Sequence, residues 1–142
     1  MKLAADFQRT ASTTASLASL GADATRPRRI LFHDIMFGSE ATPADAAILW
    51  TIQRCTALGT STAVTIAYLD PGDSASESDA GENHSIEPTY TANTILLNVP
   101  LNQRATFRWV AAQGMELIVP QTASNGIGVQ TDTISTGTPV IT

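Results

Sequence analysis

The clearest alternation of apolar and polar residues lies in residues 94–120, TILLNVPLNQRATFRWVAAQGMELIVP. Period-two alternation is typical of a β-strand with one buried face. The predicted inward residues are Ile95, Leu97, Val99, Ala105, Phe107, Trp109, Ala111, Met115, Leu117 and Val119. Turn residues at 100–104 and 113–114 separate three strands. We therefore expect a meander of short antiparallel strands here.

Residues 30–37, ILFHDIMF, form an apolar run of strand length that carries bulky side chains on both faces. Such a strand lies inside a layered structure or at a subunit contact. His33 and Asp34 are adjacent, so their side chains leave opposite faces of a strand. They are therefore not expected to form a catalytic pair, and we predict that His33 is a hydrogen-bonded packing residue.

Residues 39–69 allow two interpretations. Thr42-Pro43-Ala44-Asp45 resembles the start of a helix that would end near Gly59. Against a helix, apolar residues alternate from position 48, and residues 59–69 are rich in β-branched side chains. We favour a hairpin with strands at 47–55 and 62–69 and a turn at 57–61.

Residues 70–88, DPGDSASESDAGENHSIEP, contain six acidic residues and no Lys or Arg. They predict a long polar loop on the outer surface. The ligand spacing of an EF-hand is absent, so no calcium site is predicted. Asn125-Gly126 is a strong hairpin signal, and strands are expected at 127–134 and 139–142.

About eight short strands separated by turns predict an all-β fold, a jelly-roll-like β-sandwich. Residues 26–142 are expected to form this single domain. Residues 1–25 are dominated by Ala, Ser and Thr and predict an extended N-terminal arm. Such a segment is either mobile or ordered against a neighbouring subunit.

Charge and hydropathy narrow the classes of protein. The net charge of −5 and the single lysine argue against a nucleic-acid binder. No apolar run of eighteen residues exists, and the first residues lack the apolar core of a signal peptide, so we expect a cytosolic chain with no membrane partner. Only 15% of residues are charged, which fits either a surface covered by other subunits or an ordinary threonine-rich β domain.

Recognisable chemistry is sparse in this sequence. It contains no GxSxG, HExxH, GxGxxG or phosphate-binding glycine loop, and Cys55 is the only cysteine. We therefore predict no catalytic, cofactor-binding or metal-binding residues. Arg26, Arg28 and Arg29 form the one basic cluster. They are candidate partner-binding residues, through contact with an acidic neighbour, or they mark the exposed start of a strand.

Several segments carry a resemblance to a known group of proteins. They are PLNQRATFRWVAAQGMEL with its following proline, TASNGIG, TPADAAILWTIQRCTALGTSTAVT and the Asp70-Pro71 loop. Together they resemble small virion proteins of tailed bacteriophages, over about two-thirds of the chain and without the N-terminal arm. The resemblance implies a capsid decoration or cement protein with a jelly roll, commonly a homotrimer on the outer shell.

These observations lead to one expected function and one alternative. We expect a non-enzymatic protein that bridges neighbouring major capsid proteins, associates with itself, and is assembled onto the capsid surface in the host cytoplasm. The alternative is a carbohydrate-binding or host-receptor-binding β-sandwich module of the virion. Sugar sites usually expose aromatic side chains, and Tyr90 is the one aromatic residue near the long loop.

Overall fold

A computed structural model describes residues 1–10, 12 and 14–133 of the chain. The described part contains β-strands and no helix, so the all-β class is confirmed and the helical alternative after Thr42 is excluded. The strands are β1 Leu3–Ala4, β2 Ala18–Ala22, β3 Ile30–Phe32, β4 Asp34–Phe37, β5 Ala47–Ala57, β6 Thr60–Ala63, β7 Ala67–Tyr68, β8 Ser78–Ile86, β9 Thr89–Asn102, β10 Phe107–Val110, β11 Leu117–Val119 and β12 Gly126–Thr133.

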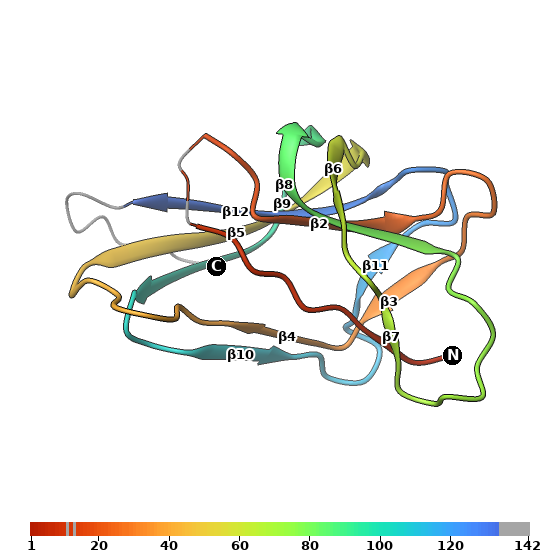
Figure 1. Ribbon diagram of the computed structural model, residues 1–142, viewed down its shortest axis with the longest axis horizontal. Coiled ribbons are helices and arrows are strands. Elements are labelled where there is room, and N and C mark those ends of the chain that lie inside the picture. The colour runs from red at the N-terminus through yellow and green to blue at the C-terminus, as the bar shows by residue number, and fades with distance from the viewer. Residues whose placement is uncertain (11, 13, 134–142) are drawn as a thin grey trace.

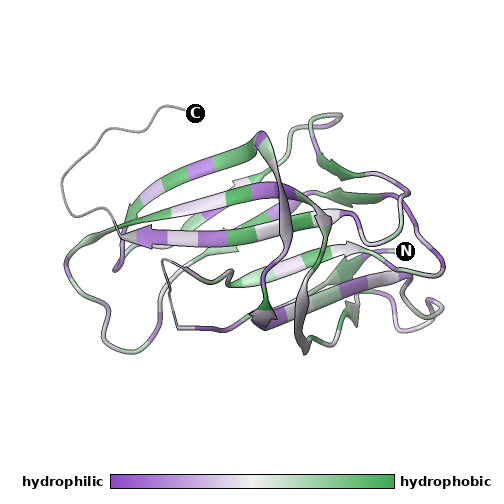
Figure 2. Ribbon diagram, turned by 90° about the horizontal axis from the view of Figure 1, so that it is seen from above, coloured by the Kyte–Doolittle hydropathy of each residue, from purple (hydrophilic) through white to green (hydrophobic). Residues whose placement is uncertain are grey.

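The strands form a β-sandwich of unequal layers (Figure 1). The large layer is a six-stranded antiparallel sheet in the order β6-β8-β2-β12-β5-β9. The small layer contains the antiparallel pairs β4–β10 and β3–β11, and a further pair joins β1 to β7. Polar and apolar residues alternate along strands of the large sheet, as expected when one face points to the core (Figure 2).

Five of the pairings are nested along the chain: β2 with β12, β3 with β11, β4 with β10, β5 with β9, and β6 with β8. A jelly roll has this path, because its chain folds as one long hairpin that wraps into two sheets. Here, however, the β6–β8 pair extends the large sheet beside β2 and does not join the small layer. The sandwich is therefore established, and the complete jelly-roll topology stays a prediction.

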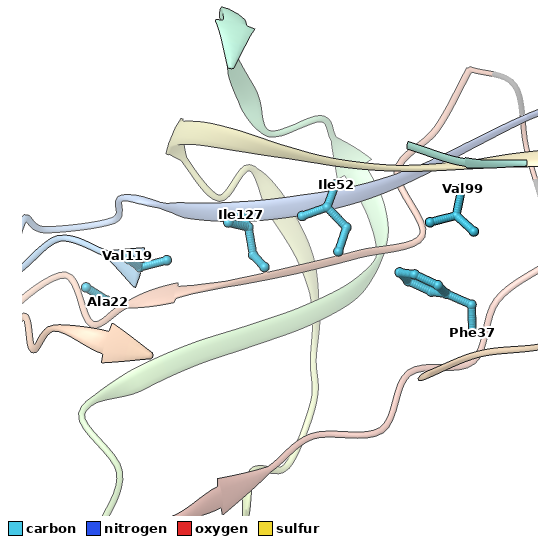
Figure 3. Close-up of a cluster of buried hydrophobic side chains, with 6 residues drawn as sticks. All are labelled: Ala22, Phe37, Ile52, Val99, Val119 and Ile127. Atoms are coloured by element: carbon cyan, nitrogen blue, oxygen red, sulfur yellow. The ribbon is translucent and has the colours of Figure 1, made fainter. Parts of the chain in front are cut away.

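The two layers meet in a small apolar core (Figure 3). Its buried members are Ala22, Phe37, Ile52, Val99, Val119 and Ile127. Phe37 reaches from the small layer towards the large sheet and stacks on Trp50, with ring centroids 5.1 Å apart. Burying one such large side chain contributes roughly 1.5–3 kcal/mol. This cluster is where the layers are joined.

The predicted meander is wrong in its pairing, although its three strands exist. β9, β10 and β11 pair with β5, β4 and β3, and none of the three pairs with another. Asn125-Gly126 likewise does not close a hairpin, because β12 pairs with β2 and β5. Alternation defines which face of a strand is buried, but it carries no information about the neighbouring strand. The strand predicted at 139–142 lies outside the described residues.

The predicted arm is wrong for residues 18–22. They form β2, which lies between β8 and β12 in the large sheet. Ala18 and Ala22 are 3% and 0% exposed, so this strand is part of the core. Small side chains were interpreted as a sign of weak packing, whereas here they allow close approach of neighbouring elements.

The prediction of a polar loop at 70–88 is also wrong for about half of these residues. Residues 78–86 form β8, which pairs with β2 on one side and β6 on the other. The predicted hairpin of 47–55 with 62–69 fails for the same reason, since β6 pairs with β8. Gly59 nevertheless makes the expected turn after β5, with a φ of 76°. Pairing with β2 and β6 on its two sides thus makes 78–86 a strand in spite of the low strand propensity of Ser, Asp, Gly and Asn.

Residues 30–37 form two strands that are separated at His33. The interruption changes the phase of the alternation, so Ile30, Phe32, Ile35 and Phe37 all face inward. In the single unbroken strand that the sequence predicts, Ile30 and Phe32 would lie on the face opposite Ile35 and Phe37. Leu31 and Met36 are 45% and 70% exposed. Met115 and Ile95, both predicted to face inward, are 70% and 50% exposed, whereas Leu117 and Val119 do pack inward.

Candidate partner-binding site

An open cleft of about 2570 Å3 lies between the two layers. Half-buried apolar side chains line it from both layers, among them Trp50 of the large sheet and Ile35 of the small layer. Phe37 and Ile127 belong to both the core and the cleft wall, so the cleft opens directly beside the core. The strands of this domain therefore leave a partly apolar space that they do not close themselves.

Residues 1–10 run lengthwise through this cleft in an extended conformation (Figure 1). Leu3, Ala5, Phe7 and Arg9 are half-buried, and the residues between them are exposed. This alternation is that of a strand with one face against a surface. We call residues 1–10 the N-terminal arm from here on.

Few backbone hydrogen bonds hold the N-terminal arm. β1 pairs with β7 over two residues only, and the Leu69 amide donates to the Lys2 carbonyl at 3.0 Å. Further along, the Gln8 amide donates to the Glu82 carboxylate at 2.9 Å, and the Gln8 side chain bonds Glu40. A strand in the large sheet is bonded along its whole length, whereas this arm is fixed mainly at its two ends.

Arg26, Arg28 and Arg29 lie beside the cleft, directly before β3. Arg26 approaches Glu77 at 3.7 Å, and the Arg28 guanidinium hydrogen-bonds the same carboxylate. The hydrogen bond from Arg28 lowers the pKa of Glu77, and Glu77 raises the pKa of Arg28. An acidic residue of the same chain thus already pairs with two of the three arginines, and their role in binding a partner stays a prediction.

His33 and Asp34 diverge as their adjacency predicts. His33 Nδ1 lies 3.7 Å from Glu116, and its side chain is 66% exposed, so the prediction of a packed histidine is wrong. Asp34 accepts two hydrogen bonds from Arg108 Nε, at 2.9 and 3.1 Å. These bonds lower the pKa of Asp34. The two side chains therefore have separate partners.

A second buried region contains polar side chains, among them Ser16, Ser19 and His84. The Ser16 amide donates to the Glu87 carboxylate at 2.7 Å, and the Ser16 hydroxyl lies 2.7 Å from Tyr90 Oη. Tyr90 lies over Gly128, where a Cβ would meet its hydroxyl at 2.2 Å. Burial raises the pKa of Tyr90 to about 12. The glycine is therefore required for Tyr90 to pack against the sheet.

A serine–histidine pair lies in the same buried region. His84 Nε2 is 2.9 Å from Ser19 Oγ, and Ser19 donates its own proton to the Leu58 carbonyl at 3.3 Å. Nδ1 of the same imidazole is buried and has no hydrogen-bond partner among the described residues. Ser19 and His84 are 1% and 6% exposed, so no substrate can reach the hydroxyl in this conformation.

Cys55 is buried as well, at 3% exposure, and burial raises the pKa of its thiol to about 11. A protonated, covered thiol is a poor nucleophile and a poor metal ligand. Among the described residues, no group of three or more His, Cys, Asp or Glu side chains is placed to bind a metal ion. The same part of the chain contains no helix long and apolar enough to cross a membrane.

The sequence did not reveal this buried polar region, because β8 was interpreted as a solvated loop. The one available signal was His84 within an otherwise small and polar segment. Comparison of the chain with known protein families, with curated proteins and with solved structures finds no match. The cleft with its N-terminal arm is the site that the geometry favours for binding a partner.

Proposed function

We propose that this chain is a non-enzymatic structural protein of a bacteriophage virion, which decorates or cements the capsid. In this proposal it binds copies of itself, as a homotrimer on the outer shell, and bridges neighbouring major capsid proteins. The observation that carries the proposal is the N-terminal arm, an amphipathic extended segment held at few points in a cleft of its own domain. Arms of this kind can contact a neighbouring subunit when one is present.

The surface of the chain also supports a binding role. Leu69, Ile86, Ile95 and Val110 are each at least 50% exposed, as are three methionines. Single exposed apolar residues are ordinary, but here they occur on a chain in which only 15% of residues are charged. In a symmetric shell each copy repeats the same contact, so contacts that are weak individually add up.

Removal of the N-terminal arm tests the proposal. A variant that lacks residues 2–9 keeps β2 and the whole large sheet, so we expect it to fold with a β-sheet circular dichroism spectrum. It should no longer cosediment with empty shells of the virion that the protein decorates. Removal of residues 1–25 is unsuitable, because it deletes the central strand β2.

The matched control keeps the arm and replaces its outward residues Lys2 and Asp6 with serine. These side chains are exposed, so we expect their replacement to leave cosedimentation much less affected than the truncation. If the truncated chain binds shells as well as the wild type, the arm has no part in attachment. If the wild type binds no shell at all, the virion assignment fails.

The alternative, a carbohydrate-binding or host-receptor-binding module, has less support from the structure. Tyr90, the aromatic residue near the acidic segment, has its hydroxyl hydrogen-bonded within the buried polar region. Among the Phe, Trp and Tyr residues of the described chain, Tyr68 alone reaches 36% exposure. Its hydroxyl accepts a hydrogen bond from the Ser76 amide. A glycan array decides between the two, because selective binding of one glycan class would favour the alternative.

A further inference from the structure

The outward face of the β4–β10 pair differs from the rest of the small layer. The inward side chains of the pair are Ile35, Phe37, Phe107 and Trp109. The outward side chains are Asp34, Met36, Arg108 and Val110, which we call the β4–β10 outer face. Met36 and Val110 are 70% and 58% exposed, so half of this outer face is apolar and open to solvent.

The two charged residues of the β4–β10 outer face form a compact ion pair. Arg108 Nε donates to both carboxylate oxygens of Asp34, at 2.9 and 3.1 Å, and Arg108 Nη2 bonds the same carboxylate. Both side chains remain substantially exposed, at 44% for Asp34 and 63% for Arg108. The face thus presents one negative and one positive charge side by side, between two apolar side chains.

We propose that the β4–β10 outer face binds the same face of a second copy of this chain, related by a two-fold axis. Such an axis places Asp34 of one copy against Arg108 of the partner copy, and the reverse pair forms by symmetry. Met36 and Val110 of the two copies then cover the four charges from water. The inference rests on the self-association proposed above. A two-fold axis joins copies in pairs, so this contact is additional to the three-fold contact of a homotrimer.

The charge pattern selects this occupant over others. A partner surface of one sign would attract one of the two charges and repel the other. A purely apolar partner would remove both charges from water without supplying new hydrogen bonds. A second copy offers opposite charges at matching positions together with its own Met36 and Val110. It therefore provides an ionic partner for each charge and apolar contacts for both apolar side chains.

Two charge reversals test the contact. Asp34→Arg gives two positive charges at positions 34 and 108, and Arg108→Asp gives two negative ones. We expect the two-fold association of each variant alone to be at least tenfold weaker than that of the wild type, in sedimentation velocity over a range of concentrations. An equimolar mixture should recover this association, in complexes that native mass spectrometry shows to contain equal numbers of the two variants.

Two controls accompany this experiment. The double variant that carries both reversals keeps opposite charges and should self-associate like the wild type. Ala92→Lys changes an exposed residue of β9 and should leave association unchanged. Circular dichroism confirms that each variant is folded, and recovery on mixing itself requires folded chains.

The outcomes separate the two proposals. If the wild type self-associates but mixing the reversed variants recovers nothing, the β4–β10 outer face is not the contact, and the proposed self-association stands without it. If the wild type stays monomeric at every concentration tested, the proposed self-association is refuted and this contact with it.

Discussion

Replacement of Phe37 by alanine is the most direct test of how the two layers are joined. Phe37 belongs to β4 of the small layer, yet it is 5% exposed because it packs into the core of the large sheet. Its ring stacks on Trp50 at 5.1 Å and on Phe107 at 6.4 Å. It is the one aromatic member of the buried cluster of six residues.

The expected loss of stability follows from these contacts. Truncation of a buried phenylalanine to alanine removes its transfer free energy and leaves a cavity, which together cost about 3–5 kcal/mol. The two stacked ring pairs place Phe37→Ala in this range and not below it. Since a domain of this kind has a total stability of roughly 5–15 kcal/mol, the variant should be close to unfolding at moderate temperature.

Urea unfolding followed by tryptophan fluorescence measures this loss, because Trp50 contacts the deleted ring. The variant Met36→Ala provides the control, since it truncates the neighbouring residue, which is 70% exposed. At a concentration where the chain is monomeric we expect this control to change stability by less than about 0.5 kcal/mol. A loss below about 1 kcal/mol for Phe37→Ala would mean that the small layer does not pack on the large sheet.

Three further predictions concern single sites. Gly128→Ala places a Cβ 2.2 Å from Tyr90 Oη and should lower stability by about 1–3 kcal/mol in urea unfolding, with part of the loss recovered when Tyr90→Phe removes the hydroxyl. The lowered pKa of Asp34 stabilises the fold above the unfolded pKa, and this contribution disappears as the pH falls through the folded value. The stability difference between wild type and Arg108→Ala should therefore shrink below about pH 4, and a pH-independent difference would contradict the ion pair. Cys55, with a pKa of about 11, should react with a thiol reagent at pH 8 at least tenfold more slowly in the folded chain than in urea, whereas equal rates would mean that the thiol is exposed.

The sequence predicts the strands where their side chains alternate strongly. Residues 105–111 alternate in burial at every position, and residues 47–55 lie within β5. In these segments the residues that face the core are large and apolar, so the pattern contains the information about burial. The fold class follows from such segments alone.

The same reasoning could not predict which strands pair, or that the segments of β2 and β8 are strands. β2 and β8 contain small and polar side chains, and they are strands because their neighbours on both sides supply hydrogen bonds. Such stabilisation comes from residues distant in the chain, which a local pattern does not record. The phase change at His33 is a similar case. This residue lies between β3 and β4, and the interruption puts Ile30 and Phe32 on the face opposite to the one that unbroken alternation predicts.

The candidate site was anticipated in part. Composition indicated an N-terminal arm, and the structure places residues 1–10 in an extended segment within the cleft. The cleft itself depends on how far the layers separate, which no segment of the sequence encodes. The three arginines were identified as a cluster, but Glu77, the partner of Arg26 and Arg28, lies in the segment that was predicted to be a polar loop on the outer surface.

The position of β2 in the large sheet also bears on how the chain is made. During synthesis β2 leaves the ribosome before both strands that flank it, β8 and β12, and β12 is the last strand among the described residues. The nascent polypeptide can pair β2 with β8 first, but the other edge of β2 stays open until β12 has emerged. Sheets closed by contacts this far apart in the chain form slowly and expose open edges in the meantime. Production of this protein should therefore depend on chaperones and on slow translation more than its small size suggests.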